Sequence, residues 1–142
     1  MLKQFDLSKM DAVMEIWLNT NIAAHDFIPK EYWYNNLEVV KTMLPNAEIL
    51  IYEDDVIKGF VGVVDKAYIA GLFVSKQFQG CGIGAKLIEE CKKRYPILML
   101  DVYEKNNKAI DFYRNHGFRI KDKKENSDTK ELEYTMQWTV EA

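Results

Sequence analysis

A glycine-rich stretch, Q-G-C-G-I-G (Gln79–Gly84), stands directly before a segment with helical periodicity. Such a turn lets the backbone N–H groups at the start of a helix approach an anion closely, because glycine has no side chain and the first-turn N–H groups have no partner within the helix. The helix dipole favours the same negative charge. The stretch therefore predicts an anion-binding turn, and the rest of the sequence has to indicate which anion.

A dinucleotide is one alternative, because Gly80-x-Gly82-x-x-Ala85 satisfies the relaxed Rossmann pattern and Asp101 follows at about the spacing of a ribose-binding acid. Two features argue against it. Ser75–Gln79 separates the glycines from the preceding strand, and Asp101 stands in the middle of its own strand. A P-loop would need Gly-Lys-Ser/Thr, which does not follow. A plain turn that only joins a strand to a helix stays open as a second alternative.

A second pattern, N-x-x-A-x-x-F-Y-x-x-x-G-F, runs from Asn106 to Phe118. Together with Gln79–Gly84, which fits Q/R-x-x-G-x-G/A, it resembles the two signatures of the GNAT (GCN5-related N-acetyltransferase) superfamily. The segments Trp17–Trp33 and Leu98–Tyr113 are similar to a narrower group of small bacterial acetyltransferases, so the resemblance covers nearly the whole chain. It implies that the anion is the pyrophosphate of acetyl-CoA.

The first half of the chain predicts a short strand, two helices and a β-rich segment. Ser8 and Asp11 form a capping box ahead of a helix that runs to about Ala24. A second helix follows Pro29 and stops at Pro45. The expected strands are residues 1–7, Glu48–Glu53, Val56–Val64 and Tyr68–Val74, with a hairpin turn at Asp54-Asp55. Gly71 predicts either a bulge or a close backbone approach.

The second half predicts two more helices and closing strands. The glycine turn opens a helix that ends before Pro96, and a shorter helix spans about Asn107 to Asn115. Between them Ile97–Tyr103 is a nearly continuous apolar run, typical of a buried strand parallel to its neighbour. Residues from Leu132 to Val140 alternate as a strand does, and the charged run Lys121–Lys130 predicts a solvated hairpin loop.

These elements predict an α+β fold with the order β-αα-βββ-α-β-α-ββ. The sheet is expected to be mixed and mostly antiparallel, with one parallel β-α-β crossover. This is also the order of the GNAT fold that the resemblance implies.

The resemblance further implies where acetyl-CoA binds. The pyrophosphate is expected on the backbone of Gln79, Gly80, Cys81, Gly82, Ile83 and Gly84. Leu72, Phe73 and Val74 are expected to present backbone groups to the pantetheine, which in this family lies between two diverging strands, and one of their N–H groups to donate to the developing oxyanion. Asn106 is expected to support the pantetheine, to cap the last helix, or both.

Tyr113 is implied as the general acid that protonates the departing thiolate. A tyrosine with a reference pKa of about 10 stays protonated at neutral pH, and a thiol near 8.5 is a matching proton acceptor. Deprotonating a lysine acceptor at pH 7 costs about 4.6 kcal/mol, so a base or a water chain is needed. Asp65, Glu104 and His25 are the candidates, and His25 falls in the connection between the first two helices, where this family builds its acceptor cleft.

Length and composition narrow the class. A chain of 142 residues predicts a single domain, residues 1–142. A net charge of −3 argues against nucleic acid or an anionic membrane as the main partner. Two cysteines ten residues apart predict neither a disulfide framework nor a metal site, and the N-terminus lacks an apolar signal segment. A cytoplasmic protein is expected, and a homodimer is left open.

The leading interpretation is therefore an acetyl-CoA-dependent N-acetyltransferase acting on a primary amine. By resemblance, the acceptor amine belongs to lysine side chains of proteins. One alternative is a small-molecule acceptor such as a polyamine, an amino acid or an aminoglycoside. Another is a non-catalytic module that binds acyl-CoA.

Overall fold

The computed structural model describes residues 1–140 and confirms the predicted order of elements. The strands are β1 (Leu2–Gln4), β2 (Glu48–Glu53), β3 (Ile57–Val64), β4 (Tyr68–Val74), β5 (Ile97–Tyr103), β6 (Arg119–Glu125) and β7 (Leu132–Thr139). The helices are α1 (Met10–Ala24), α2 (Lys30–Met43), α3 (Ile83–Arg94) and α4 (Asn107–Asn115). Short 3-10 turns span Leu7–Lys9, Leu44–Asn46 and Lys76–Phe78.

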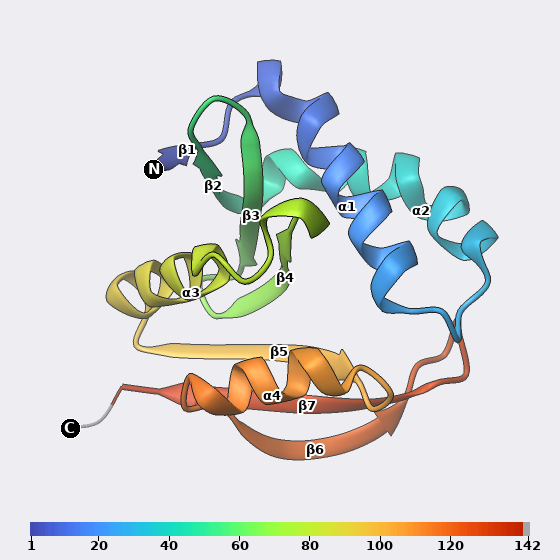
Figure 1. Ribbon diagram of the computed structural model, residues 1–142. Coiled ribbons are helices and arrows are strands. Elements are labelled where there is room, and N and C mark those ends of the chain that lie inside the picture. The colour runs from blue at the N-terminus through green and yellow to red at the C-terminus, as the bar shows by residue number, and fades with distance from the viewer. Residues whose placement is uncertain (141–142) are drawn as a thin grey trace.

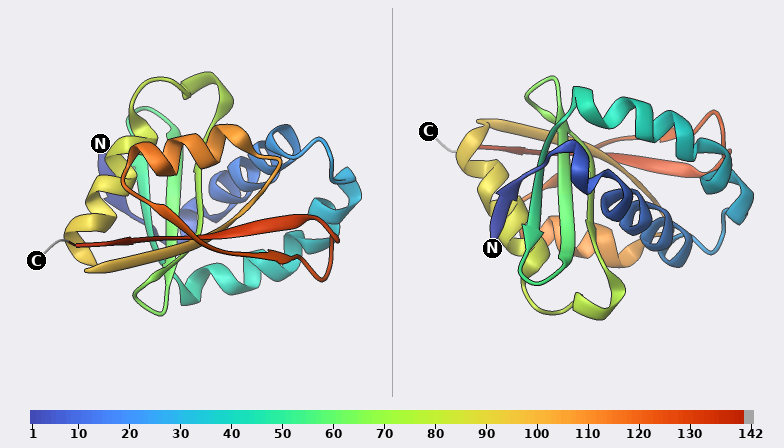
Figure 2. Two further views of the ribbon diagram at one scale, coloured as in Figure 1. Left: turned by 90° about the horizontal axis from the view of Figure 1, so that it is seen from below. Right: turned by 90° about the horizontal axis from the view of Figure 1, so that it is seen from above.

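The strands of the described residues form one mixed sheet in the order β1-β2-β3-β4-β5-β7-β6. Helices α1 and α2 cover one face, and α3 and α4 lie on the other (Figures 1 and 2). The period of two divides the strands between two cores. In β2, Ile49 and Ile51 pack with α1 and α2, whereas Leu50 packs with the core that contains α3.

The sheet opens between β4 and β5, which form its parallel pair. Their register contains a single pair, Tyr68 with Met99, and the Met99 amide donates to the Ala67 carbonyl at 2.8 Å. Beyond this point the two strands separate, and Figure 1 shows β5, β7 and β6 running across the direction of β2 to β4. The structure therefore leaves one side of β4 without a strand partner over most of its length.

A bulge lies beside this opening, as the sequence predicted for Gly71. Gly62 pairs with Gly71 but the next residue, Val63, pairs with Ile69, so β4 holds one extra residue at this point. Such an extra residue bends and twists its strand, which fits the separation of β4 from β5.

The predicted capping box at the start of α1 is wrong. Asp6, not Ser8, is the capping residue, and its Oδ1 accepts from the Ser8 amide at 2.9 Å. That bond draws Ser8 into a 3-10 turn, so α1 begins only at Met10 and has no side-chain cap. A carboxylate two residues upstream thus competes successfully with the hydroxyl.

The charged run Lys121–Lys130 is only partly a loop, which corrects the prediction. Its first five residues belong to β6, the edge strand beside β7. An edge strand leaves its outer backbone groups to water, and lysine-rich side chains suit that position because they oppose pairing with another chain.

The expected burial of β5 is also too high: Ile97, Met99 and Asp101 are only half-buried, while Leu98 and Leu100 lie in the core.

Candidate active site

The turn before α3 presents a row of free backbone donors. Among residues 1–140, the N–H groups from Gly80 to Ala85 have no acceptor in the protein. The first bond at this end runs from the Lys86 amide to the Gly82 carbonyl, at 3.1 Å. Six consecutive unpaired N–H groups at the positive end of a twelve-residue helix form an anion site of the kind that the sequence predicts.

The glycines of this turn serve different purposes. Gly80 and Gly82 have φ values of 83° and 81°, a left-handed conformation that disfavours side chains. Gly84 is needed for packing instead, because a Cβ there would lie 3.3 Å from the Phe112 ring of α4. The turn is therefore held against α4 at the same time as its amides stay open.

Two side chains tie the turn to its neighbours. The Gln79 amide donates to the Val74 carbonyl at the end of β4, and Lys108 of α4 donates to Gln79 Oε1, both at 2.9 Å. Lys108 brings a positive charge beside the row of N–H groups, and the sequence reading missed it. A lysine in the first turn of a helix is unfavourable because it opposes the helix dipole, and this unusual position could have marked Lys108 as a candidate binding residue.

The backbone of β4 faces the opening at alternate residues. The Ser75 amide donates to the Lys58 carbonyl at 2.9 Å. Because every second residue of an antiparallel strand bonds to the same neighbour, the backbone N–H and C=O groups of Phe73 also point toward β3. The N–H and C=O groups of Leu72 and Val74 point away from β3, and the Val74 carbonyl duly meets Gln79. Of the three residues that the sequence singled out, Leu72 and Val74 offer backbone groups to the opening, while the Phe73 ring packs on Phe60.

Tyr113 lies in the core beside α3. It is 8% exposed and packs edge to face on Phe112 and Phe118. Burial raises the pKa of Tyr113, with the nearby Cys91 thiol as a smaller cause. No hydrogen bond to its hydroxyl forms within residues 1–140, so that proton is free for a ligand and stays on oxygen at neutral pH.

Asn106 caps α4, one of its two predicted roles. Its Oδ1 accepts from the Ala109 amide at 3.2 Å, and its Nδ2 lies 3.3 Å from His25 Nε2. His25 is only 9% exposed, and its Nδ1 lies 3.0 Å from the Asn21 carbonyl. Burial lowers the pKa of His25, although the Asn21 carbonyl opposes this effect. Both ring nitrogens are therefore engaged, and His25 is not placed to take a proton from a substrate.

The other two candidate bases are also poorly placed. Asp65 is exposed in the β3–β4 turn, where about 20 Å of β4 separates it from the glycine turn. Glu104 lies 2.6 Å from Lys123 Nζ and accepts from the Tyr134 hydroxyl at 3.0 Å. The Lys123 hydrogen bond, followed by that of Tyr134, holds the pKa of Glu104 below its usual range.

Two other carboxylates, which the sequence reading missed as candidate bases, lie on the α1/α2 side of β5 and β7. Asp101 accepts from the hydroxyls of Tyr68 (2.8 Å) and Thr135 (2.6 Å). Burial raises its pKa, but these two bonds and one from Lys124 outweigh burial and lower it. Glu133 is half-buried, and burial together with the charge of Asp101 raises its pKa despite a bond from Asn126. Glu133 of β7 pairs with Tyr103 of β5, and Tyr103 belongs to the core under α1 and α2, so the Glu133 side chain lies on the same face of the sheet.

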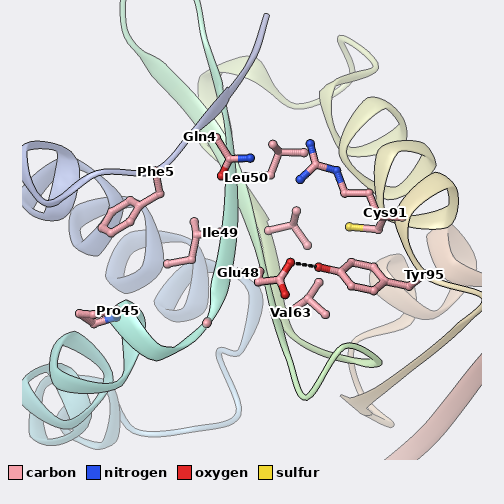
Figure 3. A pocket seen from close by; sticks show the side chains of 12 residues that line it. Gln4, Phe5, Pro45, Glu48, Ile49, Leu50, Val63, Cys91 and Tyr95 are labelled. Atoms are coloured by element: carbon pink, nitrogen blue, oxygen red, sulfur yellow. Dashed lines mark hydrogen bonds between the residues drawn. The ribbon is translucent and has the colours of Figure 1, made fainter.

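Two hollows lie away from the glycine turn. One, of about 290 Å³, lies at the other end of α3, where the side chains of Glu48 and Tyr95 hydrogen-bond each other (Figure 3). The other, of about 370 Å³, lies between the start of α2 and the β6–β7 loop and is lined by Phe27, Tyr32 and Asp128 among others. The second is on the side of the sheet that holds His25.

Comparisons with known proteins agree with this geometry. The Acetyltransferase (GNAT) domain family matches residues 45–120. The chain is 34% identical to the peptidyl-lysine N-acetyltransferase YiaC of Escherichia coli K12 over 142 residues, 99% of this chain and 97% of YiaC. It is 30% identical to the peptidyl-lysine N-acetyltransferase YjaB of the same organism, covering 83% of this chain and 81% of YjaB.

Solved structures extend the likeness to the fold. The solution structure of apo YjaB from Escherichia coli superimposes with a TM-score of 0.83 at 24% identity, covering 96% of this chain and 95% of YjaB. A Bacillus anthracis str. Ames structure in complex with acetyl coenzyme A gives a TM-score of 0.59 at 25% identity, covering 68% of this chain and 64% of that one. The fold is thus that of an N-acetyltransferase. The chain belongs to the GNAT acetyltransferase family.

Among residues 1–140, no helix combines the length and the apolar character that crossing a bilayer requires.

Proposed function

We propose that this N-acetyltransferase transfers the acetyl group of acetyl-CoA to lysine side chains of proteins. The observation that supports acetyl-CoA as the cosubstrate is the row of unpaired N–H groups from Gly80 to Ala85, which fits a pyrophosphate. Lys108 adds positive charge beside it. Support for the acceptor comes from YiaC and YjaB, both named peptidyl-lysine N-acetyltransferases.

The residues around the opening divide the work of acetyl transfer. When bound, acetyl-CoA supplies the activated thioester. The N–H groups of Leu72 and Val74, which β3 does not use, orient the carrier along β4 and donate to the acetyl oxygen as it gains charge. Tyr113 holds a proton on its hydroxyl at neutral pH and gives it to the departing sulfur.

The acceptor amine has to lose a proton on the opposite side of the sheet. Asp101 and Glu133 provide negative charge there, which attracts a lysine ammonium. Glu133 is the better proton acceptor of the two, because its raised pKa lies closer to neutral pH and it is not occupied by three donors as Asp101 is.

The protein is also proposed to act in the cytoplasm, where thiols stay reduced. Both cysteines, Cys81 and Cys91, are free.

A panel of acceptors tests the proposed function. Thiol release from acetyl-CoA is followed with a peptide that has a blocked N-terminus and one lysine, the same peptide with arginine instead, a peptide with a free α-amine and no lysine, and spermidine. We expect turnover with the lysine peptide, an added acetyl group on that lysine by mass spectrometry, and none with the arginine peptide. Turnover with spermidine alone would favour a small-molecule acceptor, and acetyl-CoA binding without any turnover would favour a non-catalytic module.

A further inference from the structure

His25 is buried where the end of α1 meets α2, β5 and the start of α4. It is the C-cap residue of α1, and its ring stacks on Trp33 of α2 with centroids 5.2 Å apart. Its edges meet Phe27 and Tyr103 at 5.7 Å and 5.1 Å. Asn106, at the start of α4, is the one polar side chain that reaches it within the described residues.

The hydrogen bonds at this corner can be assigned in one way. Asn106 Oδ1 accepts from the Ala109 amide, so its Nδ2 is the group that faces His25, and Nδ2 can only donate. His25 Nε2 must therefore carry a lone pair. Nδ1 then holds the hydrogen and donates to the Asn21 carbonyl. The three bonds form one directed chain that requires a neutral imidazole.

We propose that His25 is a positioning residue that fixes the N-terminal cap of α4, and that a proton on its ring breaks this cap and disturbs Tyr113. The functional half of this inference rests on the proposed role of Tyr113 as the acid. The structural half, the coupling of His25 to the α4 cap, does not.

A second proton on the ring leaves no arrangement in which every group is paired. Nε2–H would face the Asn106 amide N–H, donor against donor. If the Asn106 amide rotates by half a turn, its oxygen meets Nε2–H but its nitrogen then faces the Ala109 amide, and the α4 cap is lost. Either outcome removes one of the two bonds that Asn106 now makes.

Among residues 1–140, no charged group contacts the ring to compensate for such a proton. The groups packed on the ring are the Asn21 carbonyl from α1, Trp33 from α2, Phe27 from the α1–α2 connection and Tyr103 from β5. Burial raises the pKa of Tyr103 to about 12, so it stays neutral in acid. Lys105 contacts the Phe27 ring and is paired with Glu131. With no compensating charge among these groups, burial lowers the pKa of His25.

The cap matters because α4 is short. It has nine residues, and Tyr113 lies seven residues after Asn106, about 10 Å along the helix axis. A helix of this length depends on its cap and its packing, since isolated short helices are marginal. Loss of the cap therefore loosens the helix that holds Tyr113 in the core beside α3.

The experiment is an NMR titration of the ring signals, since the chain has two histidines and His116→Gln assigns the other. In the wild type we expect His25 to titrate below the ordinary histidine range, and the protection of the Ala109 amide against exchange to fall with the same midpoint. Asn106→Asp places a carboxylate against Nε2 and should raise the His25 pKa by about one unit or more. Asn107→Asp is the matched control on the exposed neighbouring residue and should leave it unchanged.

Two results would overturn the coupling. One is titration of His25 with no change in Ala109 protection; the other is an equal pKa change in Asn106→Asp and Asn107→Asp. A kinetic arm tests the functional half. In the Glu133→Gln background, where the proposed proton acceptor no longer titrates, kcat should fall below the His25 midpoint with a smaller change in the KM for acetyl-CoA. This fall should be absent in the Glu133→Gln/His25→Gln double variant. Because the NMR readouts need no turnover, they hold even if the acceptor assignment fails.

Discussion

The two sides of the β4–β5 opening are built from different kinds of group. On the α3/α4 side the turn Gln79–Gly84 and the end of β4 present backbone N–H groups, positioned by glycine and by the sheet. On the α1/α2 side Phe27, Tyr103 and Glu133 present side chains. Backbone recognition suits a cosubstrate that never changes, whereas side chains can vary with the acceptor, so mutations should separate the two sides cleanly.

The largest expected effect comes from Tyr113, the proposed acid for the leaving sulfur. Tyr113→Phe keeps the ring volume in the core, so the fold should persist, but it removes the proton for the leaving sulfur. We expect kcat to fall by about 100-fold or more, with the KM for acetyl-CoA nearly unchanged. Tyr95→Phe is the matched control, because its hydroxyl pairs with Glu48 at the far end of α3. Equal rates for wild type and Tyr113→Phe would remove the acid role.

Glu133→Gln tests the acceptor side alone. We expect kcat with the lysine peptide to fall by about 30-fold, less than for Tyr113 because Asp101 still supplies charge, with the KM for acetyl-CoA unaffected. The wild-type rate should fall as pH drops through the pKa of Glu133, since a protonated carboxyl cannot accept a proton. The variant should lose this part of the acid limb and keep only the part that follows His25. Glu131→Gln, two residues earlier in the chain and paired with Lys105, is the control. A changed acetyl-CoA KM would contradict the division between the sides.

Gly82→Ala tests the backbone side. At a φ of 81° a Cβ costs about 1–2 kcal/mol, and part of this cost should appear as misaligned amides. We expect acetyl-CoA to bind up to about tenfold more weakly by calorimetry, with the preference among acceptor peptides unchanged. Gly62→Ala controls for the loss of a glycine, because a Cβ there meets only Ile49 at 3.9 Å. Equal affinities in the two variants would show that the left-handed turn does not set the amides.

Much of the backbone side was predictable because its signals are local. The strand–turn–helix order, the bulge at Gly71 and the Asn106 cap each depend on a few neighbouring residues, and the structure confirms them. Local reasoning failed where a competing neighbour decided, as when Asp6 rather than Ser8 took the capping role. It failed again at Lys121–Lys130, where the charged residues from Asp122 to Glu125 pair with β7 and so form a strand.

The candidate bases show what sequence order cannot supply. Asp65, Glu104 and His25 were chosen by residue type and by position along the chain. The structure leaves Asp65 at a distant turn and pairs Glu104 with Lys123. The base that we propose instead, Glu133, belongs to a strand that follows the second signature.

The order of elements and the glycine turn could be predicted from short segments, because period, capping and φ are local properties. Packing was needed to show which β4 amides are free, which carboxylates share a face with Tyr103, and that His25 meets Asn106 from 81 residues away. Those contacts join segments remote in the chain, and burial, which exists only once the segments pack, then sets which of their groups carry a proton.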